Sequence, residues 1–250
     1  MNHSEKLAIN MLNFEHLAKI ILKRILMLNQ WPENSNPKFI LSFSGGKDST
    51  LALYHALQQG ECVGLIMMLS DEGDHSRSHG VPMSITQKQA DSLNFPILSA
   101  QSSWDDYEVN YLQLLEDAKL KGAELLVTGD IDVPEHASWH EQIVQKVDLD
   151  LYMPLWNRPR REIVEEFVNR GFKAMIVSVN LTMGMTTEDL GKMLTLEMIQ
   201  NLEDRGIDPC GEAGEFHTLV INGPIFKSPI EVFPIDIRSN GTNAFLQLTS

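Results

Sequence analysis

Short apolar runs alternate with longer amphipathic segments along residues 37–155. The apolar runs have the length of strands and lie at 39–43, 63–69, 96–99, 125–128 and 151–153. The segments between them carry apolar residues at helical spacing and lie at 49–59, 84–93, 103–121 and 134–147. This order predicts an α/β fold: a parallel five-stranded sheet with helices on both faces.

The pattern changes on both sides of this region. Residues 5–30 carry apolar positions at helical spacing, so residues 1–36 are predicted to be a helical extension with a linker. Beyond residue 155 we expect helices and strands at 160–170, 173–179, 187–205, 231–237 and 244–248. Residues 37–155 and 156–250 are therefore predicted to be two domains, the second smaller and of the α+β class.

Two local signals predict how elements begin and end. Ser84 and Gln87 have the spacing of a capping box, which predicts a side-chain cap at the start of a helix. Asn222–Gly223 follows an apolar run and predicts a two-residue hairpin turn.

Charge and composition narrow the classes of function. The net charge of −14 over 250 residues argues against a nucleic-acid partner, which requires clustered Lys and Arg. No uncharged apolar run is long enough to span a membrane. Only Cys62 and Cys210 are present, which fits a reduced, cytoplasmic setting. The N-terminal helix is expected to pack on the domain or on a second subunit, so a homodimer is one expectation.

One loop follows the first predicted strand and leads directly into a helix. Adjacent Gly45 and Gly46 allow backbone amides to approach an anion closely. The helix start that follows offers unpaired N–H groups and the positive end of the helix dipole. Such a place binds phosphate or pyrophosphate, yet the spacings of the Walker A and dinucleotide-binding motifs are both absent.

The loop instead carries the pattern S-G-G-x-D-S, filled by Ser44, Gly45, Gly46, Lys47, Asp48 and Ser49. It resembles the PP-loop of the N-type ATP pyrophosphatases, which cleave ATP between the α- and β-phosphates. The resemblance implies that residues 37–155 bind ATP, with Ser42, Ser44, Ser49 and the loop amides around the pyrophosphate. Lys47 would supply positive charge, and Asp48 would hold the magnesium that bridges the phosphates. The family places adenine near Met67 and Met68.

Further candidates lie where the predicted strands end. Ligands of open parallel sheets sit beyond the carboxyl ends of the strands. Four segments are predicted to meet there, at 44–49, 70–82, 99–103 and 129–132. Among them, His79–Gly80 is expected on phosphate or substrate and Arg77 on the leaving pyrophosphate, while Gly129 and Asp130 complete the expected ATP site.

A second motif, Gly211–Thr218, resembles the G-E-x-G-E-F-x-T segment of the diphthine–ammonia ligase family. His79–Gly80, Pro154–Trp156 and Asn222–Phe226 also fall in the family's order. The resemblance implies a ligase that adenylates a carboxylate and then lets ammonia displace AMP. It also implies that residues 156–250 bind substrate through Trp156, Gly211, Glu212, Gly214, Glu215, Phe216, His217 and Thr218.

The roles of the two motif carboxylates stay open at this point. Glu212 and Glu215 are expected to bind a cationic group or magnesium, or to act catalytically as a general base beside Lys47 and Asp48. The alternative is a solvated loop or salt bridges to Arg158, Arg160 or Arg161. Phe216 and Trp156 are expected either to form an aromatic wall against a quaternary ammonium or simply to pack.

Three further residues could have a chemical role or could simply be structural. His136 and His140 are four apart, but the second His of a zinc-binding H-E-x-x-H motif is missing, so no metal is expected there. Cys210 is either a nucleophile or a packed thiol.

One segment departs from the archaeal and eukaryotic ligases. Gly129–Asp132 reads G-D-I-D where those enzymes read nearer G-A-I, and it resembles a bacterial branch of the family. Bacteria do not make diphthamide, so the reaction is expected to carry over without the substrate. The expected partners are ammonia and a small-molecule or protein side-chain carboxylate, the latter on an elongation factor only if the organism makes diphthamide. The alternatives are a tRNA-modifying PP-loop enzyme and a non-catalytic ATP-binding sensor.

Overall fold

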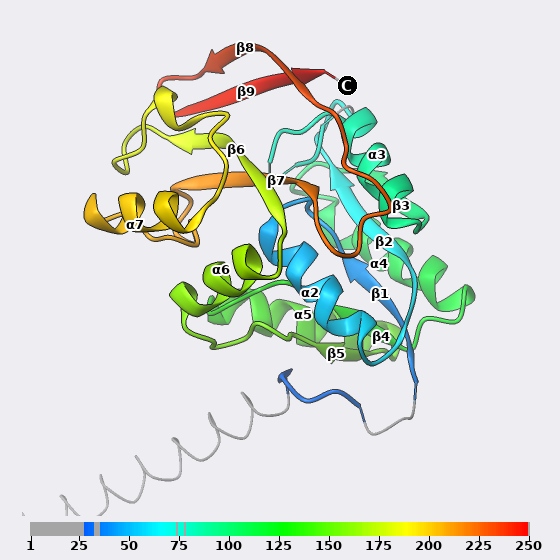
Figure 1. Cartoon of the computed structure of the whole chain (residues 1–250). Helices are drawn as coiled ribbons and strands as arrows, with labels where there is room; N and C mark the ends of the chain where they lie inside the picture. The colour runs from blue at the N-terminus through cyan, green and yellow to red at the C-terminus, as the bar shows by residue number, and fades with distance from the viewer. Residues whose placement is uncertain (1–27, 33–35, 74, 78, 250) are drawn as a thin grey trace, which may run out of the picture.

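The computed structural model describes residues 28–32, 36–73, 75–77 and 79–249. The predicted helix over residues 5–30 lies almost entirely outside them. The first sheet has five parallel strands in the order β3-β2-β1-β4-β5, which confirms the predicted fold class (Figure 1). Its strands are β1 (Lys38–Ser42), β2 (Glu61–Leu69), β3 (Ile97–Gln101), β4 (Leu125–Val127) and β5 (Asp150–Tyr152).

Helices cover both faces of this sheet because alternate residues of a strand point to opposite sides. Phe39 and Leu41 of β1 pack with α2 (Lys47–Leu57) and α3 (Met83–Leu93). Ile40, between them, packs with α4 (Tyr107–Leu120) and α5 (Pro134–Val147). The central strand is thus buried on both sides, as its apolar sequence requires.

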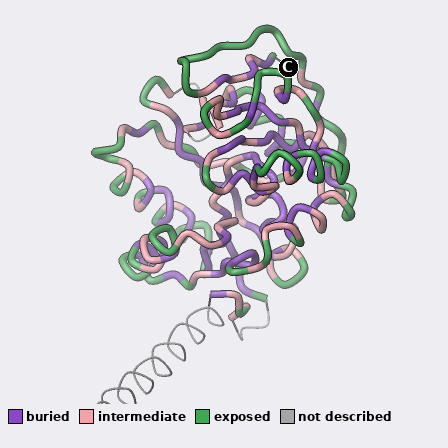
Figure 2. Tube along the Cα trace, turned by 90° about the vertical axis from the view of Figure 1, so that its left-hand side faces the viewer, coloured by how far each residue is buried: buried purple, intermediate pink, exposed green. Residues whose placement is uncertain are grey.

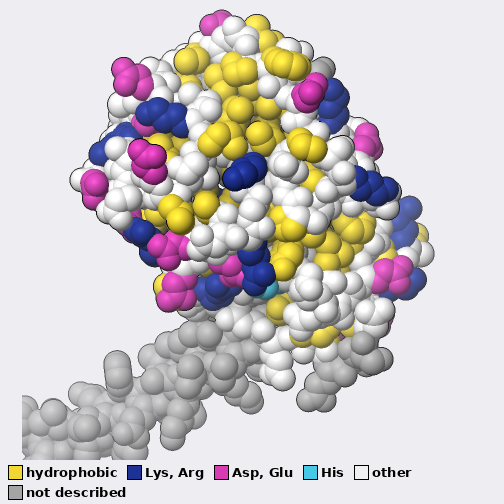
Figure 3. All heavy atoms as spheres, in the orientation of Figure 1, with side chains coloured by type: hydrophobic (Ala, Val, Ile, Leu, Met, Phe, Trp, Pro, Cys, Tyr) yellow, Lys and Arg dark blue, Asp and Glu magenta, His cyan; other side chains and the backbone are white. Residues whose placement is uncertain are grey.

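The second part of the chain forms a separate four-stranded antiparallel sheet in the order β7-β6-β9-β8. Its strands are β6 (Lys173–Asn180), β7 (Phe216–Asn222), β8 (Phe233–Ser239) and β9 (Asn243–Thr249), with helices α6 (Arg160–Asn169), η1 (Thr187–Asp189) and α7 (Leu196–Asp204). This α+β arrangement was also predicted. Apolar side chains gather on the surface where β8 and β9 lie (Figure 3). Strand β8 itself carries the exposed Phe233, Ile235 and Ile237.

Helix α2 joins the two parts. Leu53 faces the core of the first sheet, whereas Leu51 belongs to a buried cluster with Ala174 and Phe216 of the second. Buried stretches accordingly run through the middle of both parts (Figure 2). The boundary between two domains near residue 155 stays a prediction, since one hydrophobic cluster contains residues from both sides of it.

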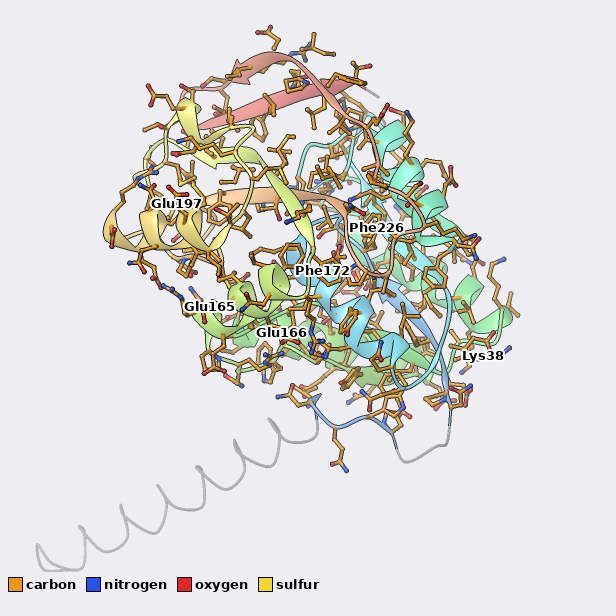
Figure 4. The ribbon with its side chains drawn as sticks, in the orientation of Figure 1. Lys38, Glu165, Glu166, Phe172, Glu197 and Phe226 are labelled. Atoms are coloured by element: carbon orange, nitrogen blue, oxygen red, sulfur yellow. The ribbon has the colours of Figure 1, made fainter. Side chains whose placement is uncertain are left out.

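Both local signals were wrong. Helix α3 begins at Met83 after Pro82, so Ser84 lies inside the helix and the predicted cap does not form. In the described part of the chain β7 pairs with β6 alone and ends at Asn222, without a hairpin. Gly223 is required for a different reason, because a Cβ there would collide with the ring of Phe172, which lies between α2 and α6 (Figure 4).

Candidate active site

The glycine loop after β1 is held from two directions. Gly45 has a φ of +79°, which favours glycine, and a Cβ there would lie 2.5 Å from Oε1 of Gln89. The carbonyl of Gly45 accepts hydrogen bonds from Nε2 of Gln89 and from the amide of Val220, both at 2.9 Å. The loop conformation therefore depends on α3 and on β7 of the second sheet.

The two loop serines shape the loop itself. The hydroxyls of Ser44 and Ser49 lie 3.1 Å apart, and the Ser44 amide donates to the Ser49 hydroxyl at 3.3 Å. The Gly46 amide donates back to the Ser44 hydroxyl at 3.3 Å. These bonds close the loop over the start of α2.

The start of α2 is capped from across the molecule. The amide of Lys47 donates to Oγ1 of Thr218 at 3.1 Å, although the two residues are 171 positions apart. A Cβ on Gly46 would collide with the ring of His79 and lie 3.2 Å from the Thr218 carbonyl oxygen. The second motif thus packs directly against the glycine loop.

Lys47 connects the loop to the opposite wall. Its buried Nζ donates to Oδ2 of Asp48 at 2.7 Å and to the carbonyl of Cys210, and lies 5.8 Å from the ring centre of Phe216. Burial opposes the charge, but the carboxylates of Asp48 and Glu212 raise the pKa of Lys47 above its ordinary value. The lysine therefore stays a cation in the interior.

A cavity of about 820 Å³ opens between the two motifs. This volume suits a small-molecule ligand. The predicted site residues that line it are Ser42, Ser44, Lys47, Asp48, Ser49, Met68, Arg77, His79, Gly129, Asp130, Gly211, Glu212, Gly214, Phe216, His217 and Thr218. The loops after β1, β2 and β4 thus converge with the second motif.

Other predicted residues do not line this cavity. Gly45, Gly46 and Gly80 lie beside it, while Met67 points to the opposite face of β2 from Met68. Trp156 packs with Leu28, Ala137 and Met153, so the expected wall of Phe216 and Trp156 does not form. The carboxylate of Glu215 is buried and accepts a hydrogen bond from the amide of Ala213 at 3.0 Å.

Glu212 is the motif carboxylate that faces the cavity. Burial and the negative charge of Asp48 raise its pKa to about 7. The arginines considered as its partners pair elsewhere: Arg158 with Glu166, Arg160 with Asp132 and Asp208, and Arg161 with Glu165 and Glu203. Glu212 is therefore poised to exchange a proton near neutral pH.

Asp48 fits a magnesium role in part. Its buried Oδ1 has no hydrogen-bond partner among the described residues, while Oδ2 pairs with Lys47. No three His, Cys, Asp or Glu side chains in that same part of the chain form a metal-binding group. Because Mg²⁺ is commonly held by one or two carboxylates plus phosphates, Asp48 would hold it only together with a nucleotide.

Two of the histidines that line the cavity, His79 and His217, are stacked and neutral. The rings of His79 and His217 lie 4.7 Å apart at an angle of 25°. Burial lowers the pKa of His217 to about 4 and that of His79 well below its usual range. Because Nδ1 of His79 lies 3.0 Å from the Thr218 carbonyl and must donate to it, Nε2 of the neutral ring is an acceptor.

An aromatic wall was missed in the sequence. Trp104, just before α4, lines the cavity together with Tyr107 of α4 and Trp139 of α5, and the Trp104 and Tyr107 ring centres lie 5.8 Å apart. Arg77 lies against the same wall, its guanidinium 4.6 Å from the Trp104 ring centre. The spacing of residues 104 and 107 was the only signal, and Trp139 joins them through helix packing.

Cys210 also borders the cavity, but as a packed thiol. Burial raises the pKa of the Cys210 thiol, and its Sγ donates to the Arg160 carbonyl at 3.2 Å. A protonated, hydrogen-bonded thiol is a poor nucleophile. Its carbonyl is the group that contacts Lys47.

Comparison with known families agrees with this geometry. Residues 37–151 match the diphthamide synthase N-terminal domain, and residues 159–250 match the diphthamide synthase C-terminal domain. The chain belongs to the diphthamide synthase family. The family expected from the two motifs is thus confirmed.

Curated relatives carry the name diphthine–ammonia ligase. The protein of Schizosaccharomyces pombe is 26% identical over 231 residues, which cover 82% of this chain and 38% of that protein. The human protein is 28% identical over 109 residues, 42% of this chain and 40% of that protein. The mouse protein is 25% identical over 230 residues, 81% of this chain and 85% of that protein. The chain therefore spans about two-fifths of the length of the first two.

None of the helices in the described residues is long and apolar enough to cross a membrane.

Proposed function

We propose that this protein is an ATP-dependent ligase that adenylates a carboxylate and lets ammonia displace AMP, forming an amide. The observation that carries the proposal is the convergence of the Ser44–Ser49 loop and the Gly211–Thr218 motif on one cavity, joined by the buried cation of Lys47. Relatives named diphthine–ammonia ligase support the same reaction.

Each wall has a role in this proposal. The start of α2 and Lys47 bind the β- and γ-phosphates, which depart together as pyrophosphate. Asp48 would hold Mg²⁺ through Oδ1, which has no hydrogen-bond partner among the described residues, and the ion would neutralise charge on the phosphates. Glu212, on the facing wall, binds the acceptor or the entering ammonium. The acceptor is diphthine on an elongation factor, or another carboxylate in a cell that makes no diphthamide.

Product analysis tests the proposal directly. The purified protein is incubated with ATP, Mg²⁺, ammonium and elongation factor 2 carrying diphthine, in parallel with a metabolite extract screened by mass spectrometry. We expect AMP and pyrophosphate in equal amounts with one amide per ATP consumed. ADP and phosphate as products would overturn the proposal, and ATP recovered intact with every acceptor would favour a nucleotide sensor.

A further inference from the structure

A carboxylate and two imidazoles form a second polar cluster at the cavity, beside the glycine loop. Oδ1 of Asp130 accepts a hydrogen bond from Nδ1 of His136 at 3.0 Å. Its Oδ2 lies 3.2 Å from Nε2 of His140. The two histidines are one turn apart on α5, so both reach the same carboxylate in the loop that follows β4.

The hydrogen bonds determine which nitrogen of His136 is available. A carboxylate only accepts, so Nδ1 of His136 carries the hydrogen and Nε2 of the neutral ring carries the lone pair. His136 lines the cavity with its side chain 59% exposed, whereas His140 is buried. His136 is thus oriented like the base of a carboxylate–imidazole pair, and His140 positions the carboxylate.

The charges around this pair favour proton uptake by His136. Burial opposes the charge of Asp130, but hydrogen bonds from both histidines hold the pKa of Asp130 well below its usual range. The hydrogen bond to Asp130 raises the pKa of His136 against partial burial, and the charges of Asp130, Glu212 and Glu135 raise it further. The imidazole is therefore able to gain and lose a proton near neutral pH.

We propose that His136, oriented by Asp130, is the base that takes a proton from ammonium in the second half of the reaction. This inference rests on the proposed ligase function. Ammonium has four donors and no acceptor, so it requires acceptors around it. Nε2 of His136 and the carboxylate of Glu212 supply two from neighbouring walls of the cavity.

The proton and bond changes balance. Ammonium gives one proton to Nε2 of His136, and the ammonia that remains attacks the acyl carbon of the adenylate. A C–N bond forms, the bond from the acyl carbon to the AMP oxygen breaks, and its electron pair leaves with AMP. The new amide nitrogen loses one further proton to solvent, and the imidazolium then releases the first proton to solvent, which restores the neutral base.

The first experiment follows the His136 ring by NMR and requires no acceptor. We expect the pKa of His136 to fall in Asp130→Asn, where the carboxylate is lost, and to fall less in Glu212→Gln, which removes a more distant charge. His55→Gln, on the far end of α2, is the control and should leave the His136 titration unchanged. If the pKa of His136 is unchanged in Asp130→Asn, Asp130 and His136 do not act as a pair.

The second experiment separates proton transfer from adenylation by changing the nucleophile. Hydroxylamine is already neutral at pH 7, whereas ammonium must first lose a proton. We expect His136→Gln to lower ammonium-dependent amide formation by about 100-fold, while hydroxamate formation and pyrophosphate release with hydroxylamine stay near the wild-type rate. His136→Gln should also remove the acidic limb of the pH profile with ammonium.

The outcomes distinguish the two proposals. Equal losses with both nucleophiles would overturn the base role and leave the ligase function standing. Absence of pyrophosphate release by the wild-type protein would overturn the ligase function, and with it the base role, whatever the NMR titration shows for the Asp130–His136 pair.

Discussion

The two walls of the cavity are built in different ways. The Ser44–Ser49 wall is a glycine turn that follows one strand and leads into one helix. Ser44 and Ser49 form hydrogen bonds to each other. The Gly211–Thr218 wall has little regular structure before β7. It is held by Asp208, whose carboxylate accepts from the amides of Cys210 at 3.0 Å and Glu212 at 3.1 Å.

The Ser44–Ser49 wall can thus be recognised from a short stretch of sequence, but its hydrogen bonds are completed only by residues from other parts of the chain. The amide at the start of α2 finds its acceptor on Thr218, and the loop carbonyl of Gly45 finds its donors on Gln89 and Val220. The Ser44–Ser49 wall therefore takes its shape partly from the Gly211–Thr218 wall. A substitution in either wall should therefore alter the conformation of the other.

The largest effect should come from removing the Lys47 cation, which contacts both walls. Lys47→Met removes the charge expected on the pyrophosphate and leaves Asp48 buried without its partner. We expect turnover, measured as pyrophosphate release, to fall by about a thousandfold, the loss seen when a preorganised electrostatic contact is removed. Thermal unfolding should also occur at a lower temperature, because an unpaired buried carboxylate is costly.

Two variants control this prediction. Lys119→Met removes a lysine that likewise donates to a backbone carbonyl, that of Val147 at 2.7 Å, but outside the cavity. It should keep full turnover. Lys47→Met with Asp48→Asn should regain stability without regaining turnover; near-normal turnover in Lys47→Met itself would contradict a role on the phosphates.

Local regularity explains what could be predicted from the sequence. Helix α5 runs over Pro134–Val147 as expected, because proline suits the first helical turn and the apolar period continues to Val147. The glycine loop was likewise predicted from six consecutive residues. Met67 and Met68 were named together as neighbours of adenine, but only Met68 lines the cavity. An all-apolar strand carries no alternation that distinguishes its two sides, so the sequence could not separate them.

Tertiary contacts explain what could not be predicted. Trp156 is buried by Leu28 and Ala137, which lie far from it in sequence. The cavity wall of Trp104, Tyr107 and Trp139 exists because α4 and α5 pack side by side. Of two glutamates three positions apart, only Glu212 lines the cavity, since the Glu215 carboxylate turns to the Ala213 amide.

The Gly211–Thr218 wall should show a smaller effect that depends on pH. The pKa of Glu212 is about 7 in the folded protein, against 4.5 for the free side chain. Between these values the folded state binds more protons than the unfolded state, so stability falls as pH rises from about 4.5 to about 7. Glu212→Gln cannot lose this proton. It should therefore be more stable than wild type at pH 8 by about 1 to 3 kcal/mol, and equal near pH 4.

Denaturant unfolding at both pH values measures this difference. Glu215→Gln is the matched control from the same motif, since its carboxylate lies outside the cavity. The Glu212→Gln protein should also lose turnover while it gains stability, which is expected when a buried group is kept for function. If the difference in free energy of unfolding between Glu212→Gln and wild type is the same at pH 4 and pH 8, ionisation of Glu212 does not destabilise the folded protein.

The smallest effect should come from the single hydrogen bond that caps α2 from the opposite wall. Thr218→Val keeps the shape of the side chain but leaves the Lys47 amide without its 3.1 Å acceptor. We expect the free energy of unfolding to fall by about 1 to 2 kcal/mol, with faster hydrogen exchange at the Lys47 amide. Thr218→Ser retains the hydroxyl, so it should protect that amide as wild type does. If the Lys47 amide exchanges equally fast in the valine and serine variants, the start of α2 does not depend on the Gly211–Thr218 wall.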